Sequence, residues 1–180
     1  MGAHEFSIPA SDLDAGGKQV RFPVRAAWIR GALEGTEVAQ GGSDGVLDVR
    51  LSKSGNDVVV RGRLTAELTV PCARCLEPAL IVVNEPVSAL AVPASELRPS
   101  VAAEKEGEDL PARDPEMIGY DGETLVLDDL VRDELLLAVP MIPLCSEGCP
   151  GISPAISSES AQSAVDPRLR PLLQLKKSPM

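Results

Sequence analysis

The chain has 180 residues, of which 44% are hydrophobic but only 2% aromatic, and its net charge is −10 at pH 7. This length predicts one domain with additional flexible segments, and no stretch approaches the roughly 18 to 20 apolar residues of a membrane-spanning helix. The acidic balance opposes non-specific binding to a nucleic-acid backbone, which depends on Lys and Arg. The N-terminal sequence MGAHEFSIPA lacks the basic and apolar regions of a secretory signal, so we expect a cytoplasmic protein.

The first quarter of the chain gives a weak structural signal. Residues 1–17 are mostly small and polar and are predicted to form a flexible N-terminus. Residues 18–34 alternate between apolar and polar side chains at first and then lose that period, so we predict a strand or an extended segment. The glycines of residues 35–45 predict a loop.

A regular alternation of apolar and polar residues follows and is typical of half-buried strands. It predicts strands at 46–53 and 58–70, and residues 54–57 (SGND) between them have the composition of a tight turn. The two strands are therefore predicted to form a hairpin. A third strand is predicted at 79–91, where Pro86 indicates an edge position or a bulge.

Acidic residues, prolines and glycines dominate residues 93–123, which predicts a solvated, mobile loop. One helix is predicted after it, at residues 128–139, with Asp128 as its N-cap and Pro140 as the residue that ends it. Its apolar residues recur at helical spacing and predict a stripe that packs on the sheet. They are Leu127, Leu130, Val131, Leu135 and Ala138.

Four cysteines form a C-x2-C pair, Cys72 and Cys75, and a C-x3-C pair, Cys145 and Cys149, separated by 69 residues. Each pair lies near prolines in a predicted turn or loop, much like the knuckles of a zinc ribbon. Four thiolates can close a tetrahedral zinc site. We therefore predict that the pairs converge on one structural zinc ion, with the four sulfurs within about 4 Å of one another.

Other interpretations of the cysteines stay open from the residues alone. They could be unligated buried thiols, because the two pairs are much farther apart than the roughly 15 to 20 residues usual in two-knuckle sites. A disulfide is disfavoured in a reducing cytoplasm. The alternative from another functional class is a thiol-redox or zinc-dependent enzyme that uses the C-x2-C motif, although a strand and not a helix is predicted after that motif.

The sequence contains no recognisable catalytic constellation, so we predict that the protein is not an enzyme. The only histidine is His4, in the predicted flexible N-terminus, which leaves no imidazole base. Phosphate-binding loops and nucleophile elbows are missing, and no small-molecule substrate is evident. We interpret Asp128, Asp129, Asp133 and Glu134 as helix capping and solvated surface and not as a carboxylate site.

Three segments stand out in order along the chain: LTVPCARCLEP, LDDLVRDELLLAVPMIPLCSEGC and DPRLRPLLQLKK. In this order and at these distances they resemble the YceD family of bacterial large-ribosomal-RNA-accumulation proteins, over about residues 45 to 177. Members are described as predicted metal-binding and possibly nucleic-acid-binding. The resemblance implies a role in large-subunit ribosomal RNA accumulation or ribosome biogenesis. The chain departs from many members in residues 151–157, which contain no further cysteine.

We therefore predict an α+β fold in which an antiparallel sheet packs against one main helix, with long mobile loops. The single domain is expected at 18–150, and residues 151–180 are expected to form a flexible Ser/Ala-rich tether and a basic-apolar tail. The expected partner is large-subunit rRNA or a basic ribosomal protein, with no membrane. Candidate contact residues, for which ordinary solvated charge is the alternative, are Arg61, Arg63, Arg74, Arg168, Arg170, Lys176 and Lys177.

Overall fold

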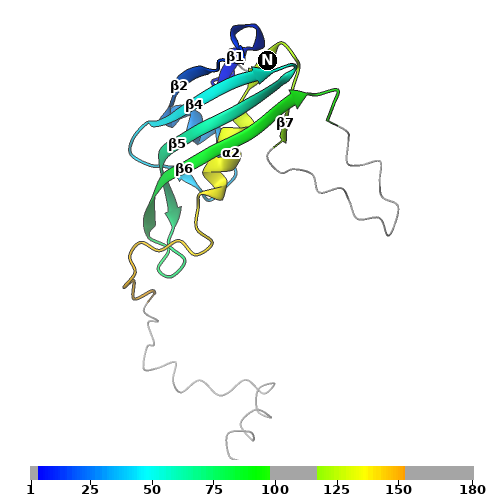
Figure 1. Ribbon diagram of the computed structural model, residues 1–180. Coiled ribbons are helices and arrows are strands. Elements are labelled where there is room, and N and C mark those ends of the chain that lie inside the picture. The colour runs from blue at the N-terminus through cyan, green and yellow to red at the C-terminus, as the bar shows by residue number, and fades with distance from the viewer. Residues whose placement is uncertain (1–3, 98–116, 153–180) are drawn as a thin grey trace, which may run out of the picture. The chain divides into compact units, whose positions relative to one another are not determined.

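A long antiparallel hairpin forms the centre of the fold, as the alternating sequence predicts (Figure 1). It joins β4 (Gly45–Ser54) to β5 (Asp57–Pro71). Gly55 in the connecting turn has φ 65°, which glycine adopts without steric cost and which matches the twist of a tight hairpin. The computed structural model describes residues 4–97 and 117–152.

The described part of the chain contains eight strands, two α-helices and a single 3-10 turn. In chain order they are β1 (Ser7–Pro9), η1 (Ala10–Asp12), β2 (Lys18–Val24), α1 (Ala26–Ala32), β3 (Ala39–Gln40), β4, β5, β6 (Pro78–Pro93), β7 (Met117–Tyr120), β8 (Thr124–Val126) and α2 (Asp128–Leu137). The main sheet has the order β2-β4-β5-β6-β7, with β3 also paired to β5. β1 and β8 form a separate two-stranded sheet.

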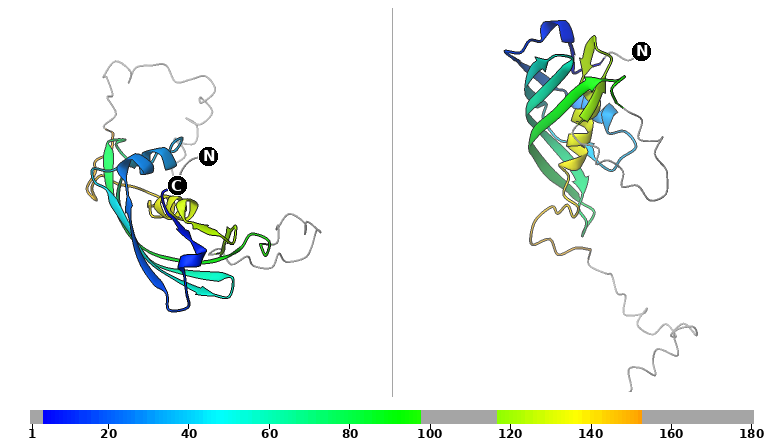
Figure 2. Two further views of the ribbon diagram at one scale, coloured as in Figure 1. Left: turned by 90° about the horizontal axis from the view of Figure 1, so that it is seen from above. Right: turned by 45° about the vertical axis from the view of Figure 1, so that its right-hand side comes forward.

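The two faces of the main sheet differ because its strands alternate. On β4, Leu47, Val49 and Leu51 are buried on the inner face, whereas Arg50 is exposed on the other. Helix α2 packs on the inner face through Val131 and Leu135. Figure 2 shows α1 and α2 on the same side of the sheet, and no described element covers the opposite side, which we call the outer face. The predicted α+β class, with a sheet packed against a main helix, is confirmed.

The prediction of a flexible N-terminus is wrong for residues 4–17. Phe6 is fully buried, and its ring packs edge-on against Phe22 and Trp28, with centroids 5.9 and 4.6 Å away. β1 pairs with β8, more than 100 residues later in the chain. The segment is ordered by these long-range contacts, which its short polar sequence does not encode locally.

The region after β2 also differs from the prediction, because it contains the helix α1 and the two-residue strand β3. Helix α1 has only seven residues, too few to be stable alone. It is held by its tertiary contacts: the Arg132 Nε–H of α2 donates to the Ala32 carbonyl at 2.8 Å, and Ile29 is fully buried.

The acidic segment is shorter than predicted. Residues 117–120 form β7, which pairs in parallel with Leu90–Pro93 of β6, so the sheet is mixed and not purely antiparallel. Residues 94–97 and 121–123 lie outside the strands, and residues 98–116 of the predicted loop lie outside the described residues. Since β7 covers only that end of β6, Pro86 lies on the open edge of the described sheet, and the continuous β5–β6 register contains no bulge.

Candidate metal centre

Two turns that are distant in the sequence meet at one end of the β5–β6 hairpin. Cys72 and Cys75 lie in the connection between β5 and β6, and Cys145 and Cys149 lie in the loop that follows α2. The Sγ atoms of Cys72 and Cys149 are 3.9 Å apart, and those of Cys75 and Cys145 are 3.6 Å apart. All four sulfurs lie within 4.8 Å of one another. The predicted convergence of the two pairs is confirmed, but the four sulfurs spread over up to 4.8 Å and not the predicted 4 Å.

The first turn is shaped by its own backbone. The Leu76 N–H donates to the Cys72 carbonyl at 3.0 Å, and the Cys72 N–H donates to the Glu77 carbonyl at 2.9 Å. Leu76 has φ 66°, the left-handed conformation that usually falls to glycine. The turn therefore directs both thiols to the same side.

The electrostatics of the first turn favour a thiolate at Cys72. The Arg74 backbone N–H donates to the Cys72 sulfur at 3.5 Å. This hydrogen bond, followed by those from the Cys145 and Cys75 backbones, lowers the pKa of Cys72 to about 6. A thiolate at the buried Cys72 is the form that binds a metal.

The neighbouring thiols oppose further ionisation. At Cys75 the Glu77 backbone lowers the pKa, but the thiol of Cys149, burial and the other two thiols outweigh it and raise the pKa to about 12. The pKa of Cys145 is also raised, first by the thiol of Cys149. Four sulfurs so close together cannot all become thiolates without a cation to offset their repulsion.

The second loop is attached to the first by hydrogen bonds. The Ala73 N–H donates to the Pro143 carbonyl at 2.8 Å, and the Arg74 guanidinium donates to the Cys149 carbonyl at 3.1 Å. Cys149 itself closes a turn by donating its N–H to the Ser146 carbonyl at 3.1 Å. Arg74, a sequence-predicted partner contact, thus has its side chain directed at the cysteine loops.

Two of the sulfur pairs have the spacing of a tetrahedral zinc site. A Zn–S bond of about 2.3 Å places the sulfurs of a regular tetrahedron about 3.8 Å apart, and the pairs separated by 3.6 and 3.9 Å fall on either side of that value. Soft thiolates suit Zn²⁺ better than Mg²⁺ or Ca²⁺, which take oxygen ligands. Four such ligands would leave no coordination position for water or substrate.

The other predicted contact residues are spread over the chain. Arg61 and Arg63 are exposed on the outer face of β5, and the Arg63 guanidinium donates to the Asn84 side-chain oxygen at 3.0 Å. The four basic residues of the tail lie outside the described residues; they are Arg168, Arg170, Lys176 and Lys177.

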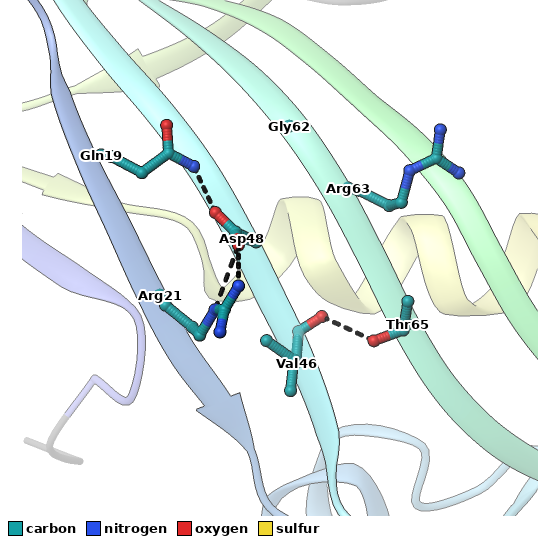
Figure 3. A pocket seen from close by; sticks show the side chains of 7 residues that line it. All are labelled: Gln19, Arg21, Val46, Asp48, Gly62, Arg63 and Thr65. Carbon is teal, nitrogen blue, oxygen red and sulfur yellow. Dashed lines mark hydrogen bonds and ion pairs between the residues drawn. The ribbon is translucent and has the colours of Figure 1, made fainter.

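Sequence reasoning missed two further arginines, Arg21 and Arg50, that lie beside Arg61 and Arg63 on the outer face. A shallow cleft of about 580 Å³ opens there, and Figure 3 shows Arg21 and Arg63 on either side of Asp48. The alternation of both strands, β2 and β4, contained this information, because Arg21 stands between Val20 and Phe22 and Arg50 stands between Val49 and Leu51.

The chain matches a known protein family over more than half of its length. The model of the large ribosomal RNA subunit accumulation protein YceD matches residues 60–176, more than half of the chain. The chain belongs to the YceD family. The match includes most of β5, all of β6 and α2, and both cysteine pairs, but not β2 or β4. No curated protein and no solved structure gives a significant match. Among residues 4–97 and 117–152 of this YceD protein, neither helix has the length and hydrophobicity of a transmembrane segment.

Proposed function

We propose that this YceD-family chain is a non-enzymatic factor for large-subunit ribosomal RNA accumulation, with a structural zinc ion held by Cys72, Cys75, Cys145 and Cys149. The observation that supports the zinc site most directly is the convergence of the four sulfurs within 4.8 Å of one another. The support for the cellular role is the family match.

The place of the zinc site in the fold suggests what the ion does. It joins the end of the β5–β6 hairpin to the loop after α2. Around it lies a small apolar cluster, separate from the main core, of which Val70 and Ala79 are members. A structural metal stabilises such a small unit because binding free energy becomes folding free energy.

A closed four-thiolate site argues for a structural and against a catalytic ion. The redox alternative requires a reactive thiolate that a substrate can reach. Cys72, whose pKa is lowered, is fully buried. The exposed thiol, Cys145, is one whose pKa is raised. Accessibility and thiolate character therefore fall on different cysteines, which disfavours redox chemistry.

The partner we propose is large-subunit rRNA or a basic ribosomal protein. The predicted contacts Arg61, Arg63 and Arg74 are all exposed. Arg63 donates a hydrogen bond to Asn84 and Arg74 donates one to the Cys149 carbonyl, whereas Arg61 has no such partner among the described residues. The basic C-terminal segment from Arg168 to Lys177 supplies further positive charge.

Two measurements test this function. Metal analysis of the purified chain should give one zinc per chain. The double variant Cys72→Ser with Cys149→Ser should contain no zinc, whereas Ser146→Ala in the same loop should retain the zinc.

Depletion of the protein in cells should lower large-subunit rRNA relative to small-subunit rRNA. Wild-type protein and Ser146→Ala should restore that ratio and the double cysteine variant should not. An unchanged rRNA ratio on depletion would refute the cellular role, and enzymatic thiol oxidation by the wild type would favour the redox alternative.

A further inference from the structure

Four arginines lie side by side on the outer face of the sheet, and we call them the arginine patch: Arg21, Arg50, Arg61 and Arg63. In the strand register Arg50 is directly opposite Arg61, and Asp48 is opposite both Arg21 and Arg63. Neighbouring strands are about 4.8 Å apart and alternate residues of one strand about 7 Å apart. All four arginines are exposed. In a chain of net charge −10, this concentration of positive charge is local.

The arrangement carries a cost that the fold does not explain. Like charges directly opposite each other on neighbouring strands are destabilising, and Arg50 and Arg61 form such a pair. Arg50 donates to the Gly16 carbonyl. Among residues 4–97 and 117–152, Arg61 has no hydrogen-bond or ion-pair partner, so its full charge faces outward. An anion placed between the two guanidiniums would remove their repulsion.

The cleft beside this pair is lined by groups that suit a phosphate. Arg21 donates to Asp48 through Nε and Nη2 at 3.0 and 2.6 Å, which leaves one guanidinium nitrogen unused. Arg63 lies on the other side of Asp48 (Figure 3), and its guanidinium donates to Asn84 of β6. The cleft is also lined by the Thr65 hydroxyl, which donates to the Val46 carbonyl, and by the Gln19 amide, which donates to Asp48. Guanidinium, hydroxyl and amide groups are the usual partners of nucleic-acid phosphates. Among the described residues, Asp48 is the only acid that lines the cleft.

The surface lacks what base recognition would need. Single-stranded nucleic acids are usually bound by stacking of bases on aromatic side chains. None of the chain's four aromatic residues serves this purpose, because Phe6 and Tyr120 are buried and Phe22 and Trp28 pack against the core. The outer face is therefore suited to the sugar-phosphate backbone and not to bases.

We infer that the outer face of the sheet binds the phosphate backbone of structured RNA through the arginine patch. This inference rests on the proposed function, which supplies large-subunit rRNA as the RNA in question. Recognition through phosphates makes binding depend on the shape of the RNA and on salt, with little dependence on base sequence.

The test uses the full zinc-loaded chain and two probes, large-subunit rRNA and an unrelated RNA duplex. The double variant Arg61→Gln with Arg63→Gln should bind both probes at least tenfold more weakly at moderate salt. The slope of log affinity against log salt should fall by about one for each phosphate that the variant no longer neutralises. Asp48→Asn should bind more tightly than wild type, because it removes the one negative charge from the cleft. Arg30→Gln, at an exposed arginine of α1 on the other side of the sheet, controls for the loss of one positive charge elsewhere and should bind like wild type.

Several results would overturn the inference. Equal affinity of wild type and the double variant would do so, as would an equal weakening in Arg30→Gln, which would indicate a general charge effect. So would the absence of RNA binding by the wild type, or a patch-dependent interaction with a ribosomal protein that survives ribonuclease.

Cell data separate this inference from the proposed function. If depletion lowers large-subunit rRNA and the double variant restores it fully, the patch is refuted and the function stands. If depletion has no effect, the function itself fails.

Discussion

The indole Nε1 of Trp28 donates a hydrogen bond of 3.2 Å to Oδ1 of Asp128, a residue one hundred positions away. The same carboxylate accepts the backbone N–H groups of Glu5 and Phe6 at 3.1 and 3.2 Å. The prediction that Asp128 caps its own helix is wrong: Leu127 is the N-cap, and α2 begins at Asp128. The carboxylate instead joins the N-terminal segment, α1 and α2.

Replacing Asp128 should therefore cost far more than the loss of a helix cap. Asp128→Ala removes a charged acceptor from three donors, so we expect a loss of about 2 to 4 kcal/mol in the free energy of unfolding. Chemical denaturation followed by the fluorescence of Trp28, the only tryptophan, measures it. Asp129→Ala, in the same first turn but exposed, is the control and should cost less than about 1 kcal/mol. Equal losses in the two variants would mean that the helix dipole, and not the network, matters.

Removal of the metal should destabilise the protein as a whole. If zinc binds the four thiolates only in the folded state, its binding free energy adds to stability. Excess chelator should lower the melting temperature of the wild type by several degrees and have no effect on the double variant Cys72→Ser with Cys149→Ser. A wild type whose melting temperature does not change in chelator would contradict a structural zinc ion.

The backbone of the first cysteine turn can be improved. Leu76 adopts φ 66° and is 67% exposed, so it has conformational strain and little burial to lose. Leu76→Gly should raise the free energy of unfolding by up to about 1 kcal/mol, because only glycine adopts this region freely. Leu76→Ala keeps the strain and should give no gain. If the glycine variant is less stable than the alanine variant, the exposed leucine makes contacts that its position does not predict.

Helix α2 provides a matched pair of leucines. Leu135 is fully buried against the sheet, whereas Leu137 is 80% exposed. Leu135→Ala should cost roughly 2 to 5 kcal/mol, the usual range for a buried leucine. Leu137→Ala should cost less than about 0.5 kcal/mol. Denaturant titration with an unchanged m-value checks both, and a small effect at Leu135 would show that α2 is not a core element.

Protonation of Asp48 should contribute to the loss of stability at low pH. Hydrogen bonds from Arg21 and then Gln19 lower the pKa of this carboxyl below its ordinary value. Its stabilising contribution is therefore present above the unfolded pKa of about 3.9 and is lost as the pH falls through the lower folded pKa. NMR titration of the carboxyl carbon should show the depressed midpoint, and Arg21→Gln should move it upward. If the Asp48 midpoint is the same in wild type and in Arg21→Gln, the ion pair does not form in solution.

Much of the sheet and the main helix could be predicted from the sequence alone. Residues 46–53, 58–70 and 79–91 show the alternation of strands, and a period of two assigns each side chain to a face without knowledge of the partner strand. The stripe of α2 follows the same logic with the helical period, and its predicted members Leu127, Val131 and Leu135 are buried.

The meeting of the two cysteine pairs could not be predicted from periodicity. Their type and their arrangement in two close pairs indicated a shared site, but whether Cys72 and Cys149 would meet depended on the path of α2 back along the sheet. The tertiary structure decided this, together with the order of residues 4–17, the parallel strand β7 and the arginine patch. Periodicity reports only on neighbours within one segment. The hydrogen bond between Trp28 and Asp128 and the pairing of Arg50 with Arg61 depend on which segments the fold places side by side, and no local pattern contains that information.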